Sequence, residues 1–316
     1  MRDSSFIEIN LGEIMILKYI NNKYSTIRQV MKQEFDISYN LSVKLKKNKQ
    51  IFLNGVSMYV DAPIQKGDVI TFVIDFDEDN SNIVPTKMDL DILYEDDAML
   101  VLDKPAGIPV HPSILHFENS LSNGVKYYFD SISLHRKIRP VNRLDRNTSG
   151  IVIFAKNEYV HSILSKQMQS NVFKKEYIAI CNGIFDVKEG TINAPIARKA
   201  DSIIERCVDR SGDVAITHYK VIKEFRASEK NSNASSNQTS YLSELLINLE
   251  TGRTHQIRVH MAYIGHPILG DSLYGDESNL IGRQALHSYK VEFIHPLTKE
   301  KLSIMAPIPK DMENLL

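Results

Sequence analysis

RPVNRLDRNTSG, residues 139–150, is the most informative stretch of this chain. It places one carboxylate, Asp145, between Arg143 and Arg146, and a Thr-Ser-Gly turn then leads into the apolar run IVIF at 151–154. Cations on both sides favour the ionised form of a carboxylate and hold it in one orientation. Two interpretations stay open for the stretch alone: Asp145 is a reactive group at the mouth of a strand, or it is a turn residue with charged neighbours.

The composition is typical of a globular protein. The chain has 316 residues, of which 43% are hydrophobic and 24% charged, so we expect one large domain or two ordinary ones. No apolar run approaches the roughly 20 residues that cross a bilayer, and the N-terminus lacks the apolar segment of a signal peptide. The two cysteines, Cys181 and Cys207, fit a reducing compartment and provide no zinc-binding spacing. We therefore expect a cytoplasmic protein without membrane association.

Charges are segregated along the chain. The formal net charge is −1, which counts mildly against a nucleic-acid binder. However, residues 136–146 contain five cations and one acid, residues 44–49 contain four lysines, and DFDEDN at 75–80 is acidic. Local basic surfaces are therefore compatible with overall neutrality. For the run at 44–49 alone, an ordinary solvated surface is the simpler interpretation.

The first 80 residues form a separate unit in the sequence pattern. Helical spacing of apolar residues predicts three helices, in residues 12–20, 25–35 and 40–48. The Asn54-Gly55 pair predicts a hairpin between two short strands, and residues 66–74 predict another strand. An acidic, turn-rich stretch follows. We therefore predict a small domain over residues 1–80, a linker over 81–90 and a larger domain over 91–316.

Strands dominate the pattern of the larger unit. Apolar runs predict strands in residues 92–96, 99–105, 150–156, 176–183, 215–225, 241–249 and 288–296. Helices are predicted in 122–129 and after Asn157, a potential cap. Because regular strand–helix alternation is absent, we predict an α+β fold: a mainly antiparallel mixed sheet flanked by helices and loops, preceded by a small α/β domain. The polar segment 228–240 predicts a hairpin loop, to which we assign no function.

LETGRTHQIRVHMAYIGHPILGD, residues 249–271, carries the second group of candidate residues. Helical spacing is shown by Ile257, Met261 and Ile264, and Thr254 is the predicted N-cap. Arg258 lies among apolar positions, where an arginine usually has an acidic partner. His255 and His260 are five residues apart and point in different directions, which excludes a metal pair.

A third stretch, FKKEYIAICNG at 173–183, places Tyr177 at the start of a strand. Taken alone, Tyr177 is more simply a core tyrosine with a bonded hydroxyl. No segment has the spacing of a phosphate-binding glycine loop, a Ser-His-Asp hydrolase or a dinucleotide fold. The acids Asp96, Asp97 and Asp103 leave open a glycoside hydrolase in which one of them works with Asp145.

Together these stretches resemble the large-subunit rRNA pseudouridine synthase family of the RluA/RluD type. The family motif HRLDxxTSG is matched by NRLDRNTSG at 142–150 except at its first position, and GRTHQIRVH occurs intact at 252–260. KKEY at 174–177 lies between them, as in the family, and KPAGIPVHP and HPILGD are also similar to family segments. The resemblance covers roughly residues 90–310.

The resemblance implies roles for individual residues. Asp145 matches the catalytic aspartate, Arg258 the arginine that pairs with it, and Tyr177 the active-site tyrosine. Arg143 matches the arginine that helps displace the target base. Further expected substrate-binding residues are Arg139, Arg146, Arg253, His255, Lys44 and Lys46. Asn142 stands where the family usually has histidine, so we expect it to act only through hydrogen bonds.

The N-terminal unit resembles the small RNA-binding domain shared with a small-subunit ribosomal protein, through SVKLKKNKQIFLNG at 42–55 and KGDVITF at 66–72. This resemblance implies that the N-terminal unit binds RNA. The resemblance of the larger unit to the synthase family implies RNA as the partner, with large-subunit rRNA as the expected substrate and tRNA as the alternative. We expect a monomer. Because the isomerisation leaves the composition of the RNA unchanged, we expect no redox cofactor or energy source. We also expect no metal, because the cysteines and histidines lack the spacing of a metal site.

Two routes stay open for Asp145: attack on the anomeric carbon, or abstraction of a sugar proton followed by elimination. Two other functions also stay open. One is a non-catalytic RNA-binding or ribosome-assembly protein on the same scaffold, and the other is the glycoside hydrolase.

Overall fold

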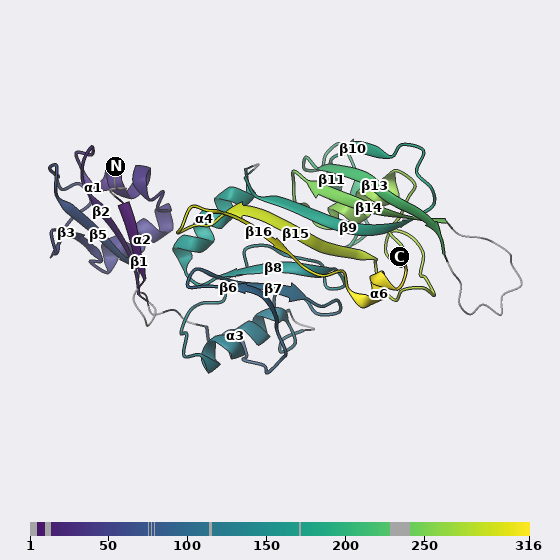
Figure 1. Ribbon diagram of the computed structural model, residues 1–316, viewed down its shortest axis with the longest axis horizontal. Helices are drawn as coiled ribbons and strands as arrows, with labels where there is room; N and C mark the ends of the chain where they lie inside the picture. The colour runs from purple at the N-terminus through teal and green to yellow at the C-terminus, as the bar shows by residue number, and fades with distance from the viewer. Residues whose placement is uncertain are drawn as a thin grey trace, which may run out of the picture.

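The computed structural model describes residues 5–9, 14–74, 76, 78, 80–113, 116–170, 172–227 and 241–316. Its strands form a small N-terminal sheet, a large sheet and a separate two-stranded hairpin (Figure 1). The loop predicted for 228–240 lies outside the described residues. Within the part of the chain that the structure describes, every helix is too short or too polar to cross a membrane.

The N-terminal sheet has the strand order β1-β2-β5-β3-β4. Its strands are β1 (Ser5–Ile9), β2 (Met15–Ile20), β3 (Ile51–Leu53), β4 (Val56–Ser57) and β5 (Val69–Ile74). Its helical segments are α1 (Ile27–Gln29), which continues as a π-helix over Val30–Glu34, and α2 (Tyr39–Lys47). Asn54 and Gly55 both have positive φ, 50° and 82°, as a tight hairpin turn requires, so the predicted hairpin is confirmed.

The helix predicted for residues 12–20 is wrong, because Met15–Ile20 forms strand β2. Met15, Leu17 and Tyr19 are buried, and the residues between them are more exposed. A nearly continuous apolar run fits both a helical and a strand period, and pairing with β1 and β5 on both sides selects the strand.

The large sheet has nine strands, in the order β10-β13-β14-β9-β15-β8-β7-β6, with β16 paired to β15. Its strands are β6 (Asp91–Glu95), β7 (Met99–Lys104), β8 (Ser149–Ala155), β9 (Lys174–Asn182), β10 (Glu189–Asn193), β13 (Ile216–Arg226), β14 (Tyr241–Leu249), β15 (Leu286–Ile294) and β16 (Lys301–Met305). Its pairs are antiparallel except β15 with β8. The predicted α+β fold with a mainly antiparallel mixed sheet is confirmed.

Helices α3 (Leu121–Ser131) and α4 (Glu158–Met168) cover opposite faces of this sheet. On β7, Leu100 and Leu102 pack in the core that contains α3, and Met99 and Val101 pack in the core that contains α4. This period of two explains why β7 is apolar at four successive positions, residues 99–102. The Asn157 Oδ1 accepts a hydrogen bond of 2.9 Å from the Val160 N–H, which confirms the predicted cap of α4.

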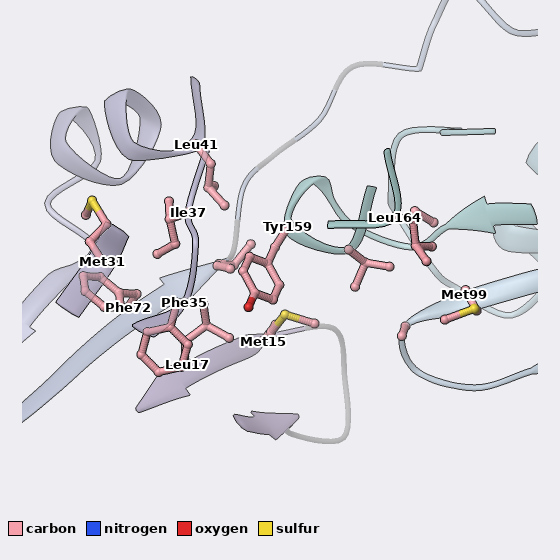
Figure 2. Packing of buried hydrophobic residues seen from close by; sticks show 14 of the residues in the cluster. Met15, Leu17, Met31, Phe35, Ile37, Leu41, Phe72, Met99, Tyr159 and Leu164 are labelled. Carbon is pink, nitrogen blue, oxygen red and sulfur yellow. The ribbon is translucent and has the colours of Figure 1, made fainter. Parts of the chain in front are cut away.

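One apolar cluster joins α4 to the N-terminal sheet. Tyr159 of α4 is 1% exposed and lies beside Met15 and Phe35 (Figure 2). Ion pairs flank the contact: Lys44 pairs with Glu158, and the Lys166 Nζ lies 2.6 Å from an Asp36 oxygen. The N-terminal unit therefore rests on the helix that follows β8. The predicted ends of the small domain at residue 80 and of the linker at residue 90 remain a prediction.

Candidate active site

Asp145 lies in the turn that precedes β8, near the middle of the large sheet. The Thr148 N–H donates a 3.1 Å hydrogen bond to the Asp145 carbonyl and closes this turn. Gly150 follows with φ of 110°, and a Cβ at this position would lie 2.3 Å from the Ser288 carbonyl oxygen on β15. Only glycine permits this close approach. The contact fixes the point at which the Asp145 turn enters the sheet.

Asn142 holds the beginning of the turn against β8. Its Nδ2 donates to the Ile151 carbonyl and its Oδ1 accepts from the Ile153 N–H, both at 2.9 Å. The side chain is buried, so these two bonds satisfy polar atoms that would otherwise be costly to bury. The hydrogen bonds expected for the Asn142 side chain are therefore made with the backbone of β8.

Lys104 holds the other end of the turn, a role that the sequence analysis did not assign. Its side chain is fully buried, and its Nζ donates to the carbonyls of Pro105 (2.7 Å), Ile108 (3.0 Å) and Arg146 (3.0 Å). Burial lowers the pKa of Lys104 to about 7. The three carbonyls supply the acceptors that a buried amine requires. The carbonyl next to Asp145 is thereby held in place.

Arg258, on helix α5 (Gln256–Tyr263), bridges two carboxylates. Its Nη1 donates to an Asp145 oxygen at 3.1 Å, and its Nε and Nη2 donate to the two oxygens of Asp271 at 2.7 and 2.8 Å. The Asp271 side chain is 1% exposed and that of Arg258 is 9% exposed. Burial opposes the charge, but the two carboxylates raise the pKa of Arg258 above its usual value. The bidentate pair with Asp271 thus directs the Nη1 of Arg258 toward Asp145.

Asp271 was missed in the sequence analysis. The burial of Arg258 predicted an acidic partner, and Asp145 was taken as that partner. Asp271 is the last residue of HPILGD, a segment noted only for its resemblance to the family. A buried arginine has five N–H donors, which was a signal for a second acid.

His255 is a second neighbour of Asp145. Its Nε2 lies 3.8 Å from an Asp145 oxygen, and its Nδ1 lies 2.8 Å from the Tyr274 hydroxyl. The same hydroxyl accepts a 2.8 Å hydrogen bond from the Arg206 N–H, and the Arg258 guanidinium lies 5.1 Å from the centre of the Tyr274 ring. Burial, then Arg258 and Arg206, lower the pKa of His255 although Asp145 opposes them. This lowered pKa favours the neutral form of the His255 imidazole.

The predicted N-cap at Thr254 is wrong, because α5 begins at Gln256 and His255 is its N-cap. His255 has a left-handed backbone, with φ of 58° and ψ of 20°. This conformation is uncommon outside glycine, although histidine adopts it more often than most residues. The Gln256 Oε1 accepts from the Thr251 hydroxyl at 2.8 Å and from the Arg253 N–H at 2.9 Å. These bonds hold the strand-to-helix turn that brings His255 to Asp145.

Asp145, His255 and Arg258 line one pocket of about 160 Å³, together with Tyr177 and Lys175 of β9. Ordinary ligand pockets measure roughly 300–1,000 Å³, so this one admits a small planar group rather than a duplex. Burial raises the pKa of Tyr177 to about 12 and lowers that of Lys175. The phenol of Tyr177 therefore stays protonated at neutral pH.

The structure brings together six of the residues predicted for the site: Asp145, Arg258, Tyr177, His255, Arg253 and Arg143 all line the pocket. Arg143 and Arg253 are exposed and lie where a larger ligand would approach.

The other four lie elsewhere. The Arg139 side chain is 10% exposed and pairs with Glu78, so its charge is already compensated away from the pocket. Lys44 pairs with Glu158, and Lys46 is exposed on α2 of the N-terminal unit. Arg146 is exposed and does not line the pocket, and its Nη1 lies 3.4 Å from the His116 Nε2.

The second carboxylate that a glycoside hydrolase would need is not supplied by the three predicted acids. As the structure describes them, Asp96, Asp97 and Asp103 do not line the pocket. Asp96 is hydrogen-bonded to Tyr94 and His295 instead, at 2.7 Å each. Arg258 links Asp145 to another acid, Asp271, whose charge it compensates.

Comparisons with known proteins identify the family of the chain. The model of the RNA pseudouridylate synthase family matches residues 98–263, a range that contains Asp145, Tyr177 and Arg258. An uncharacterized RNA pseudouridine synthase of Bacillus subtilis, YhcT, is 42% identical over 269 residues, which cover 85% of this chain and 84% of that protein. Ribosomal large subunit pseudouridine synthase D of Xylella fastidiosa is 34% identical over 284 residues, covering 85% and 81%.

A solved structure, human RNA Pseudouridylate Synthase Domain Containing 1, superposes with a TM-score of 0.56 at 23% identity. The superposition covers 69% of this chain and 83% of the human chain, and it indicates a shared fold. The sequence identities and the match to the family model show the family of the chain, which a shared fold alone does not show. The chain belongs to the RNA pseudouridylate synthase family, of the RluA/RluD type.

Proposed function

We propose that this enzyme converts specific uridines of large-subunit rRNA to pseudouridine, with Asp145 as the catalytic group. The observation that carries the proposal is the Asp145 carboxylate. It is oriented at 3.1 Å by Arg258 and is 20% exposed, in a pocket sized for one base. The name of the Xylella fastidiosa relative supports rRNA as the substrate, and tRNA stays the alternative.

The reaction breaks the bond between C1′ of the ribose and N1 of uracil and forms a bond between C1′ and C5. N1 gains a proton and C5 loses one, so the atoms balance without a cofactor. Asp145 either attacks C1′, forming an ester that the rotated base displaces, or removes a proton from C2′ to open an elimination route. Both routes require an accessible, well-oriented carboxylate, and the Arg258 contact orients that of Asp145.

Tyr177 supplies a flat surface and a hydroxyl group to the lining of the pocket. With a pKa of about 12 its phenol is not a base at neutral pH, so it does not take the proton from C5 as a phenolate. Its burial instead allows the ring to stack on uracil without a cost in side-chain order. The phenol would thus hold the base while it rotates.

The target uridine must leave its stack to reach Asp145, at a cost of a few kcal/mol. Arg143 is exposed at the pocket and two residues from Asp145, so its guanidinium is placed to fill the gap left by the base. On the N-terminal unit, Lys46 stays available to RNA, whereas Lys44 is engaged by Glu158.

The proposal is tested with an unmodified transcript of large-subunit rRNA that carries tritium at C5 of its uridines. The wild-type protein should release tritium, and Asp145→Asn should release none while binding the transcript as the wild type does. Asp97→Asn, an exposed aspartate outside the pocket, is the matched control and should stay active. Unchanged turnover in Asp145→Asn would refute the role of Asp145.

Binding without tritium release by the wild-type protein would favour a non-catalytic RNA-binding protein instead. Mapping pseudouridines in total RNA from cells with and without the gene then distinguishes rRNA from tRNA as the substrate.

A further inference from the structure

A second cavity, of about 450 Å³, adjoins the pocket of Asp145. The two share Gly252, Arg253 and Thr254, the residues that lead into α5. The opposite wall is the hairpin of β11 (Ile196–Arg198) and β12 (Arg206–Val208), which lies outside the large sheet near β13 and β14 (Figure 1). The mechanism proposed above makes no use of this cavity.

Arginines are concentrated in this cavity. Arg198 and Arg206 are direct cross-strand partners in the hairpin, and Arg253 lines the cavity from the other side. Like charges placed opposite each other on paired strands destabilise a sheet. A hairpin of three residues per strand thus keeps two arginines that repel each other next to the active site. An anionic ligand would offset this repulsion.

The protein compensates this charge only in part. Among the lining residues the acid is Asp213, whose Oδ2 lies 3.6 Å from the Arg253 Nη1. The Arg206 Nη1 donates to the carbonyls of Ile204 and Glu205, which are uncharged acceptors. Arg198 has no carboxylate partner within the described part of the chain. Three guanidiniums therefore face one carboxylate, and the cavity is suited to an anion.

The cavity wall is held rigidly. Ile196 and Asp213 exchange backbone hydrogen bonds of 2.9 and 3.0 Å, and Gly212 packs so closely that a Cβ would lie 2.3 Å from the Ile196 carbonyl carbon. The hairpin is also tied to the catalytic pocket, since the Arg206 N–H donates to the Tyr274 hydroxyl that contacts His255. A ligand bound here would therefore be positioned relative to Asp145.

We propose that this cavity binds the phosphodiester backbone of the RNA strand immediately next to the target uridine, with Arg198 as its main contact. This assignment rests on the proposed function. Guanidinium groups bind phosphate oxygens with two parallel hydrogen bonds, and a strand whose uridine enters the first pocket brings its neighbouring phosphates to the second. The site fixes the register of the strand and does not read its sequence.

The first test is the salt dependence of RNA binding, measured by fluorescence anisotropy with a labelled single-stranded oligouridine. Arg198→Ala should bind about tenfold more weakly. Loss of one phosphate contact should also reduce the slope of log K against log salt by about 0.7. Arg210→Ala is the matched control, because Arg210 is exposed, lies in the same segment and does not line the cavity. Equal slopes for the two variants would overturn the proposal.

The second test uses neutral methylphosphonate linkages placed one at a time around a mapped target uridine. At the linkage that occupies the cavity, the substitution should weaken binding of the wild type about tenfold and of Arg198→Ala hardly at all. Equal losses in both proteins at every linkage would refute the assignment.

The two proposals fail in different ways. Tritium release by the wild type with an unchanged salt slope in Arg198→Ala would remove the phosphate site and leave the enzymatic function intact. An inactive wild type with a reduced slope in Arg198→Ala would retain an RNA phosphate site and remove the enzymatic proposal.

Discussion

Removal of the Arg258 guanidinium should reduce stability because Asp271 loses its cation. It should reduce activity because Asp145 loses the donor that orients it. Arg258→Met leaves Asp271, 1% exposed, with no cation. The Leu273 N–H, at 3.2 Å, is a weak substitute. Breaking a buried ion pair in this way costs about 3–5 kcal/mol of the free energy of unfolding. Asp145 is 20% exposed and can be solvated by water, so it adds little to that loss.

The double variant Arg258→Met/Asp271→Leu separates the two effects. Because the uncompensated charge is gone and the site is apolar, most of the lost stability should return. Activity should not return, because Asp145 still lacks the donor that orients it. We expect both variants to release tritium from rRNA about 100-fold more slowly than the wild type, the usual effect of losing one such donor.

Urea unfolding followed by circular dichroism measures the stabilities. Arg28→Met is the matched control, since Arg28 binds Asp61 with the same bidentate geometry, at 2.7 and 2.8 Å, but both side chains are more than half exposed. The Arg28→Met substitution should lower the free energy of unfolding by less than about 1 kcal/mol. A double variant as unstable as Arg258→Met, or one as active as the wild type, would refute the division of roles between Asp271 and Asp145.

Three further predictions concern other parts of the molecule. Tyr274→Phe removes the hydroxyl next to His255, so turnover should fall about tenfold while the free energy of unfolding falls by about 1 kcal/mol; unchanged tritium release would exclude Tyr274 as a positioning residue. Burial lowers the pKa of His287 to about 4, and the unfolded chain binds that proton near pH 6.5, so stability is lost as the pH falls between these values, by up to about 3 kcal/mol. Urea unfolding from pH 7.5 to 4 should therefore show a flatter profile for His287→Gln, and parallel profiles would contradict the assignment. Tyr159→Ala should cost about 3 kcal/mol in the same assay, because it empties the contact between α4 and the N-terminal unit, and a loss below 1 kcal/mol would show that the contact contributes little.

Much of the fold could be predicted because strand and helix patterns are local. Residues 151–155 of β8 are an uninterrupted apolar run, Asn157 precedes a helical pattern, and the Asn54-Gly55 pair specifies a tight turn. The prediction was wrong for Met15–Ile20, where apolar residues at successive positions satisfy either period. There the two neighbouring strands decided the conformation.

The candidate site was predictable to a similar extent. Asp145, Arg258 and Tyr177 lie in motifs whose order resembles a known family, and the structure places all three in one pocket. Asp271 and Tyr274 were missed because neither stands out by spacing. Their importance comes from contacts with Arg258 and His255 that form only when the chain is folded.

The sequence by itself determined which residues are available and which local elements they form, because hydrophobic period, turn residues and charge runs act over a few positions. Only the tertiary structure decided which charges meet. Arg258 is 113 residues from Asp145 along the chain, yet in the folded protein its Nη1 lies 3.1 Å from an Asp145 oxygen. Arg139, six residues from Asp145, is instead paired with Glu78. Ion-pair partners depend on distance and burial after folding, and separation along the chain predicts neither of these.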